Sequence, residues 1–138
     1  MQVLFFKLDK PFNEASTLVF SALGFNQHME SETTFNAQGY YFYVDILDLS
    51  IVLDENNYDY EDMFNYMLTI KKSIGSAIYD ENSILGVAEI VASIIATKLE
   101  IDVAIEHELR NPNNECYSLN MFSYDGEKLS ITDKTFMN

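Results

Sequence analysis

The chain has 138 residues, of which 22 are acidic and 8 are basic, so its formal net charge is −14. This charge disfavours binding to nucleic acid or to anionic membranes, because both need clustered Lys and Arg side chains. Hydrophobic residues make up 48% of the sequence, whereas Gly (5) and Pro (2) are scarce, which excludes a disordered tail. The length fits one domain with a core of its own.

The cysteine content and the first residues indicate the compartment. Cys116 is the single cysteine, so no disulfide forms within the chain. Residues 1–10 lack the charged start, apolar stretch and cleavage site of a secretory signal. The longest apolar run, Ile84 to Ala96, is interrupted by polar residues and is shorter than the ~20 residues that cross a bilayer. We therefore expect a cytoplasmic protein without a membrane-spanning segment.

The N-terminal part predicts a strand, a helix and a weakly patterned segment. Residues 2–8 are aromatic and aliphatic, as in a buried strand. Asn13 is a plausible N-cap for a helix over residues 13–23, whose apolar residues share one face, and Gly24 suits its C-terminal end. In the polar segment that follows, only residues 33–35 have strand character.

The stretch from Tyr40 to Leu53 changes the parity of its apolar residues. They alternate on one face from Phe42 to Ile46 and continue on the opposite parity from Leu47 to Leu53. Because a shift of one residue moves every side chain to the other face, the pattern predicts two strands separated by a bulge or turn near Leu47 and Asp48.

Two helices are predicted in the middle of the chain. Asp59 is a candidate cap for the first, which runs to Ile78 and keeps helical spacing of its apolar residues. Residues 83–99 are apolar on most sides and predict a central buried helix, with a strand as the alternative because β-branched residues are frequent. The helical spacing of the first segment comes from Tyr60, Met63, Phe64, Met67, Ile70, Ile74 and Ile78.

Three strands are predicted after the second of these helices. Residues 101–109 alternate between an apolar inner face and an outer face that is mostly acidic. A second strand covers residues 116–124, and Asp125-Gly126 predicts a type I′ hairpin turn into a third strand over residues 128–131. The acids on the outer face of the first strand are Asp102, Glu106 and Glu108.

These elements together predict an α+β fold in a single domain over residues 1–138. An N-terminal strand, the central strands and a C-terminal three-stranded meander form an antiparallel or mixed sheet, which packs against about three helices. No internal repeat or linker-like segment interrupts the sequence.

The acidic residues are strongly segregated along the chain. Ten acids and no bases lie between Lys10 and Lys71, and five of these acids fall within residues 54–62. Their mutual repulsion costs stability unless a cation or a basic partner offsets it, although a solvated loop and helix cap would also explain them. The candidate partner-binding residues are Asp54, Glu55, Tyr58, Asp59, Glu61 and Asp62, with Asp102, Glu106 and Glu108 as a second patch.

The acidic loop does not match the helix–loop–helix calcium template. That template needs an oxygen ligand at position 5, Gly at position 6 and Glu at position 12. Counted from Asp54, these positions hold Tyr58, Asp59 and Asn65. We therefore predict no metal site.

The sequence contains no recognised catalytic motif. His107 lies on the apolar side of its predicted strand, which favours a histidine packed in the core over a ligand or general base. No base or helix N-terminus near Cys116 lowers the pKa of its thiol, so a structural role is favoured. Carboxylate pairs such as Asp45 with Asp48 arise by chance in so acidic a chain. We predict no catalytic residue and no cofactor.

Charge, size and the missing motifs lead to one functional hypothesis. We expect an acidic inhibitory protein that neutralises a basic protein partner, of the immunity-protein or antitoxin type, for example against a bacterial nuclease toxin. We expect no direct binding of nucleic acid. The alternatives are a phage-type inhibitor that mimics the charge of nucleic acid, a small carboxylate-dependent enzyme, and a homo-oligomeric structural module.

Overall fold

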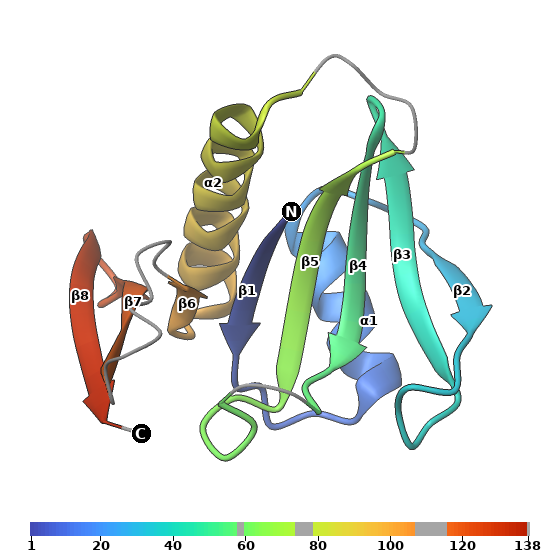
Figure 1. Ribbon diagram of the computed structural model, residues 1–138, viewed down its shortest axis with the longest axis horizontal. Coiled ribbons are helices and arrows are strands. Elements are labelled where there is room, and N and C mark those ends of the chain that lie inside the picture. Colours follow the sequence, from blue (N-terminus) through green and yellow to red (C-terminus); the bar gives the residue numbers. More distant parts are fainter. Residues whose placement is uncertain (58–59, 74–78, 107–115, 138) are drawn as a thin grey trace.

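The computed structural model describes residues 1–57, 60–73, 79–106 and 116–137. In these ranges the chain forms an eight-stranded antiparallel sheet and two helices (Figure 1). The α+β prediction is confirmed, whereas the expectation of about three helices is wrong by one. The strand order is β2-β3-β4-β5-β1-β6-β7-β8. The elements are β1 (Gln2–Phe6), α1 (Phe12–Ala22), β2 (Met29–Glu32), β3 (Tyr40–Ile46), β4 (Leu49–Glu55), β5 (Tyr66–Lys72), α2 (Glu81–Leu99), β6 (Val103–Glu106), β7 (Cys116–Tyr124) and β8 (Leu129–Met137).

Both helices pack on the same face of the sheet, which we call the covered face. Its side chains come from alternate strand residues, for example Leu4 and Phe6 of β1, and they form the main core with the apolar sides of α1 and α2. The other strand residues, such as Val3 and Phe5, point to the opposite face, which we call the open face. In Figure 1, α1 lies behind β4 and β5, so the open face of these strands is turned toward the reader.

Helix α1 confirms the first predicted helix but not its predicted cap. The residue at the N-cap position is Pro11, and the Asn13 side chain instead accepts a hydrogen bond from the Tyr40 hydroxyl at 3.1 Å. At the other end Gly24 adopts a φ of 92°, and the Phe25 amide donates to the Phe20 carbonyl at 2.9 Å. This is the glycine-terminated helix end that the sequence predicts.

The parity change in the central stretch marks a two-residue hairpin turn. Leu47 and Asp48 connect β3 to β4 with φ values of 50° and 62°, as in a type I′ turn. Asn and Gly are usual at such positions, since a left-handed backbone is costly for other residues. Here later residues hold the turn: the Tyr79 hydroxyl donates to the Leu47 carbonyl at 2.7 Å, and the Ser73 amide donates to the Asp48 carbonyl at 2.8 Å.

The predicted helix from Asp59 to Ile78 is wrong, because Tyr66–Lys72 forms the central strand β5. Its covered-face residues Leu68 and Ile70 are buried in the main core, while Met67 on the open face packs against a second apolar cluster. A strand that meets apolar neighbours on both faces does not alternate cleanly. The helical spacing therefore arose from a turn followed by a strand.

Two further segments differ in detail from the prediction. Strand β2 occupies Met29–Glu32, and residues 33–35 lie in the connection to β3. The meander is confirmed, and β7 has the predicted bounds, but its hairpin is a four-residue connection. There the Asp125 carboxylate accepts the Glu127 and Lys128 amides at 2.9 and 2.8 Å. An Asx-type side-chain contact thus replaces the predicted type I′ turn.

Helix α2 confirms the second predicted helix and excludes its strand alternative. The Asp80 carboxylate accepts the Ser83 amide at 2.8 Å, and the Met1 amino group forms an ion pair with Glu81 at 3.0 Å. The helix is not buried on most sides, since Ile90 is 62% exposed. With a hydropathy of 1.4, α2 is long and apolar enough to cross a membrane, a property that core helices of soluble proteins share. The absence of a membrane span stays a prediction.

Candidate partner-binding surface

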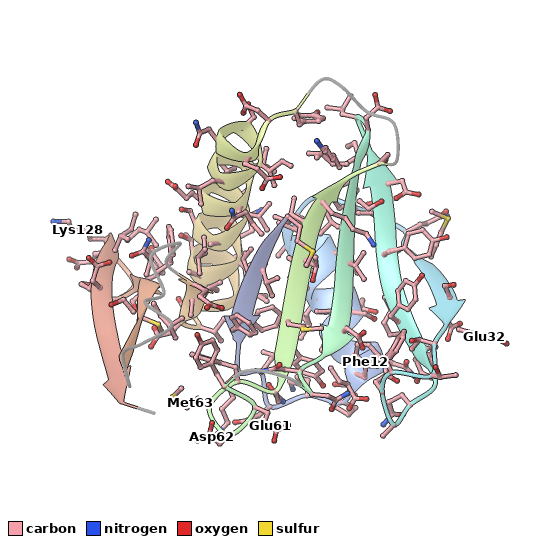
Figure 2. The ribbon with its side chains drawn as sticks, viewed as in Figure 1. Phe12, Glu32, Glu61, Asp62, Met63 and Lys128 are labelled. Atoms are coloured by element: carbon pink, nitrogen blue, oxygen red, sulfur yellow. The ribbon has the colours of Figure 1, made fainter. Side chains whose placement is uncertain are left out.

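A tight turn between β4 and β5 carries two of the predicted contact residues. We call residues 60–64 the acidic turn. Tyr60 has a φ of 61°, and its carbonyl accepts the amides of Met63 and Phe64, both at 2.9 Å. Glu61 and Asp62 lie at the tip, are exposed and point away from the strands (Figure 2).

The acidic turn is anchored to the open face by two buried aromatic residues. The rings of Tyr60 and Phe5 meet edge to face with centroids 5.2 Å apart, and the rings of Phe64 and Phe5 are 6.2 Å apart. With three residues of β6 and β7 they form a second core. The aromatic geometry adds to the apolar area that these rings bury. The second core consists of Phe5, Tyr60, Phe64, Ala104, Leu119 and Met121.

This second core overturns the predicted acidic outer face of β6. The sequence places Ala104 on a solvated side of the strand together with Asp102 and Glu106. In the structure Ala104 is fully buried beneath the acidic turn. Because Ala104 stands between acids in the sequence, this side of β6 is predicted to be solvated. The acidic turn, which is distant in the sequence, covers Ala104 instead.

Asparagine side chains fix the base of the acidic turn. The Asn65 side chain accepts the Leu8 amide and donates to the Leu8 carbonyl, each at 3.0 Å. The Asn56 side chain donates to the Phe64 carbonyl at 3.0 Å. The buried Phe64 carbonyl and the more exposed backbone groups of Leu8 are thereby satisfied. Glu61 and Asp62 are presented by a backbone that side-chain contacts hold in place.

The five clustered acids do not form one loop. Asp54 and Glu55 belong to β4 and are half-buried, whereas Tyr58 and Asp59 lie outside the described residues. One carboxylate oxygen of Glu55 is enclosed and accepts no hydrogen bond from the described residues. Burial, and secondarily the charge of Glu55, raise the pKa of the Tyr66 hydroxyl. Glu55 therefore lies on the covered face with part of its carboxylate enclosed, and its role as a contact stays a prediction.

Asp54 points to the open face near the connection between β2 and β3. Its Oδ1 atom accepts hydrogen bonds from the Asn36 side chain and, at 2.8 Å, from the Glu55 amide. Partial burial raises the pKa of the Asp54 carboxyl, and the two hydrogen bonds lower it by less. Folding therefore disfavours the charged form of this group.

The raised pKa of Asp54 predicts a pH-dependent effect of Asp54→Asn on stability. Because the native state keeps this proton to higher pH than the unfolded state, the contribution of Asp54 is lost as pH rises from the ordinary carboxyl pKa of 3.8 through the raised pKa. The stability of the variant relative to the wild type should rise over that window, by under about 1 kcal/mol because solvent screens a half-buried group. Urea unfolding at several pH values measures this, with Asp133→Asn as the control, and identical pH profiles for the two variants would contradict it.

The second predicted patch is divided between the two ends of β6. Asp102 is exposed and directly precedes Val103, which pairs with Phe6, so it lies at the end of the sheet that carries the acidic turn. Glu106 is four residues further, about 13 Å along the strand. Glu108 lies outside the described residues. Of the described residues in the second patch, only Asp102 therefore lies at the same end of the sheet as Glu61 and Asp62.

Two acids that the sequence reading passed over lie at the same end. Asp9 follows β1, and Glu100 ends α2 with a φ of 53°. The only sequence signal for these two acids is that each directly follows a predicted strand or helix. We call this set the acidic end, and none of its members forms an ion pair with a described cation, although Lys7 and Lys10 lie at the same end. The acidic end consists of Asp9, Glu61, Asp62, Glu100 and Asp102.

The described residues do not assemble a metal centre. No three His, Cys, Asp or Glu side chains among them converge to hold a metal ion. His107 lies outside the described residues, and Cys116 begins β7. Comparison with family models, with curated proteins and with solved structures gives no match to this chain.

Proposed function

We propose that the chain is an acidic binding protein that neutralises a basic protein partner, in the manner of an immunity protein or antitoxin. The observation that carries the proposal is the outward display of Glu61 and Asp62 on an anchored turn, at the same end of the sheet as Asp102. An inhibitor of a basic nuclease toxin is the example that best fits a net charge of −14.

The physical argument is that the charge cost of the acidic end is relieved by binding. Like charges held close together repel each other, and no described cation is paired with them in the free chain. A basic partner removes this repulsion and is attracted over a distance, which raises the association rate above that of a neutral pair. Because the backbone of the acidic turn is already fixed, little conformational entropy is lost on docking.

Charge reversal of the acidic turn tests the proposal. The immobilised chain should retain a basic protein from an extract of its native host at low salt. We expect Glu61→Lys with Asp62→Lys to lower the association rate constant of that protein about tenfold or more, with a weaker dependence on salt. Surface plasmon resonance at several salt concentrations measures both quantities.

The matched control carries Glu89→Lys with Glu127→Lys. These acids are exposed and lie outside the acidic end, and the change in net charge is the same. If both double variants bind the partner equally well, binding depends on net charge alone and the acidic end is not the binding site. A retained partner that is not basic would contradict the proposed function itself.

A further inference from the structure

A hollow of about 700 Å³ lies on the open face beside the connection between β2 and β3. Tyr41 of β3 and Val52 of β4 form its floor, because both alternate with residues of the main core. Residues 33–35 form one wall, and Phe35 in this wall is 75% exposed. No described helix covers this part of the sheet.

The two ends of the hollow carry opposite charges. Asp54 and Glu32 line one end of the hollow, and Lys71 of β5 lines the other end. Lys71 pairs with Ser50, four residues before Asp54 along β4, so the backbone positions of Lys71 and Asp54 are about 13 Å apart along the strands. An extended segment of about four residues spans this distance. The hollow thus distinguishes the two directions in which a chain segment can lie.

The acidic end of the hollow has the groups that recognise a guanidinium. Both hydrogen bonds of Asp54 fall on Oδ1, and Oδ2 accepts none from the described residues. The neighbouring ring of Tyr41 is 5.8 Å from that of Tyr43, which gives a continuous aromatic surface. A planar cation that stacks on an aromatic ring and donates to a carboxylate is the chemistry of arginine.

We infer that this hollow binds an extended, arginine-bearing segment of the basic partner, with the guanidinium between Asp54 and Tyr41. The inference rests on the proposed function and adds a second contact, of aromatic and apolar character, to the acidic end. A second copy of this chain is a poor occupant, since it brings a further net charge of −14. Interfaces commonly combine such an apolar and tyrosine-rich centre with a charged rim.

Two charge-matched peptides separate the hollow from general attraction. One is a blocked hexapeptide in which arginine and tryptophan alternate, and in the other glycine replaces each tryptophan. Because the chain contains no Trp, emission of the first peptide reports its own burial. We expect the tryptophan peptide to bind about tenfold more tightly by calorimetry at low salt, with a blue-shifted emission.

Variants of the hollow then decide the assignment. Tyr41→Ser and Asp54→Asn should each remove most of this tenfold preference, whereas Tyr124→Ser and Asp133→Asn, which alter the same residue types outside the hollow, should leave it unchanged. Circular dichroism confirms that each variant folds. Equal binding of the two peptides, or no binding of either, overturns the hollow as a site. Loss of partner binding through Glu61→Lys with Asp62→Lys would still support the proposed function in that case.

Discussion

Ala104→Asp should destabilise the protein by about 4 kcal/mol or more, a large part of the 5–15 kcal/mol that stabilises a typical domain. Ala104 is fully buried beneath the acidic turn, where it pairs with Phe5 of β1 on one side and with Met121 of β7 on the other. A carboxylate there loses its hydration without gaining a partner, and its larger side chain also displaces the rings above it.

Urea unfolding at pH 7 measures this loss, and Ala37→Asp is the control because Ala37 is exposed in the connection between β2 and β3. The loss should shrink as pH falls, since a buried carboxyl has a raised pKa and accepts a proton more readily in the native state. A loss similar to that of Ala37→Asp would mean that the outer side of β6 is solvated, as its sequence pattern indicates.

Several elements follow directly from local sequence. The β3–β4 hairpin is predicted because a parity change between Ile46 and Leu47 requires a break in the strand, either a turn or a bulge. The ends of α1 are less consistent. The predicted role of Gly24 is confirmed, because this helix end needs a residue with a left-handed backbone. The predicted cap Asn13 is wrong, because its side chain accepts a hydrogen bond from the Tyr40 hydroxyl instead.

Non-local contacts explain the elements that sequence reasoning missed. Tyr60 and Phe64 have the four-residue spacing of a helix face, yet both rings pack against Phe5 near the start of the chain. Residues brought together over more than fifty positions leave no periodic signal. Beside the hollow, Asn36 of the β2–β3 connection and Asp54 of β4 also meet without a local signal, since they are 18 positions apart.

The charge segregation was informative about position but not about arrangement. It pointed to residues 54–62, and the structure separates that segment into two half-buried strand residues and two exposed turn residues among those it describes. The alternation of β4 places Asp54 on the open face and Glu55 on the covered face. The density of acids therefore indicated the acidic turn, whereas strand parity decides which of its neighbours lie on the open face.

Phe64→Ala should weaken partner binding although it removes no charge. Phe64 is 7% exposed and packs on Phe5 in the second core, so the truncation should cost about 3 kcal/mol of unfolding free energy. It also removes one of the two rings that hold the acidic turn. Glu61 and Asp62 then have to be ordered when the partner binds, which we expect to weaken affinity about tenfold.

Phe42→Ala is the matched comparison, because Phe42 is 6% exposed but belongs to the main core next to Phe12. Both variants should lose similar stability, whereas only Phe64→Ala should lose affinity in titrations carried out well below the melting temperature. Equal affinities for the two variants would show that the acids act wherever they are, as a diffuse negative field. A selective loss would show instead that the fold contributes to recognition by holding two carboxylates at a fixed place on the sheet end.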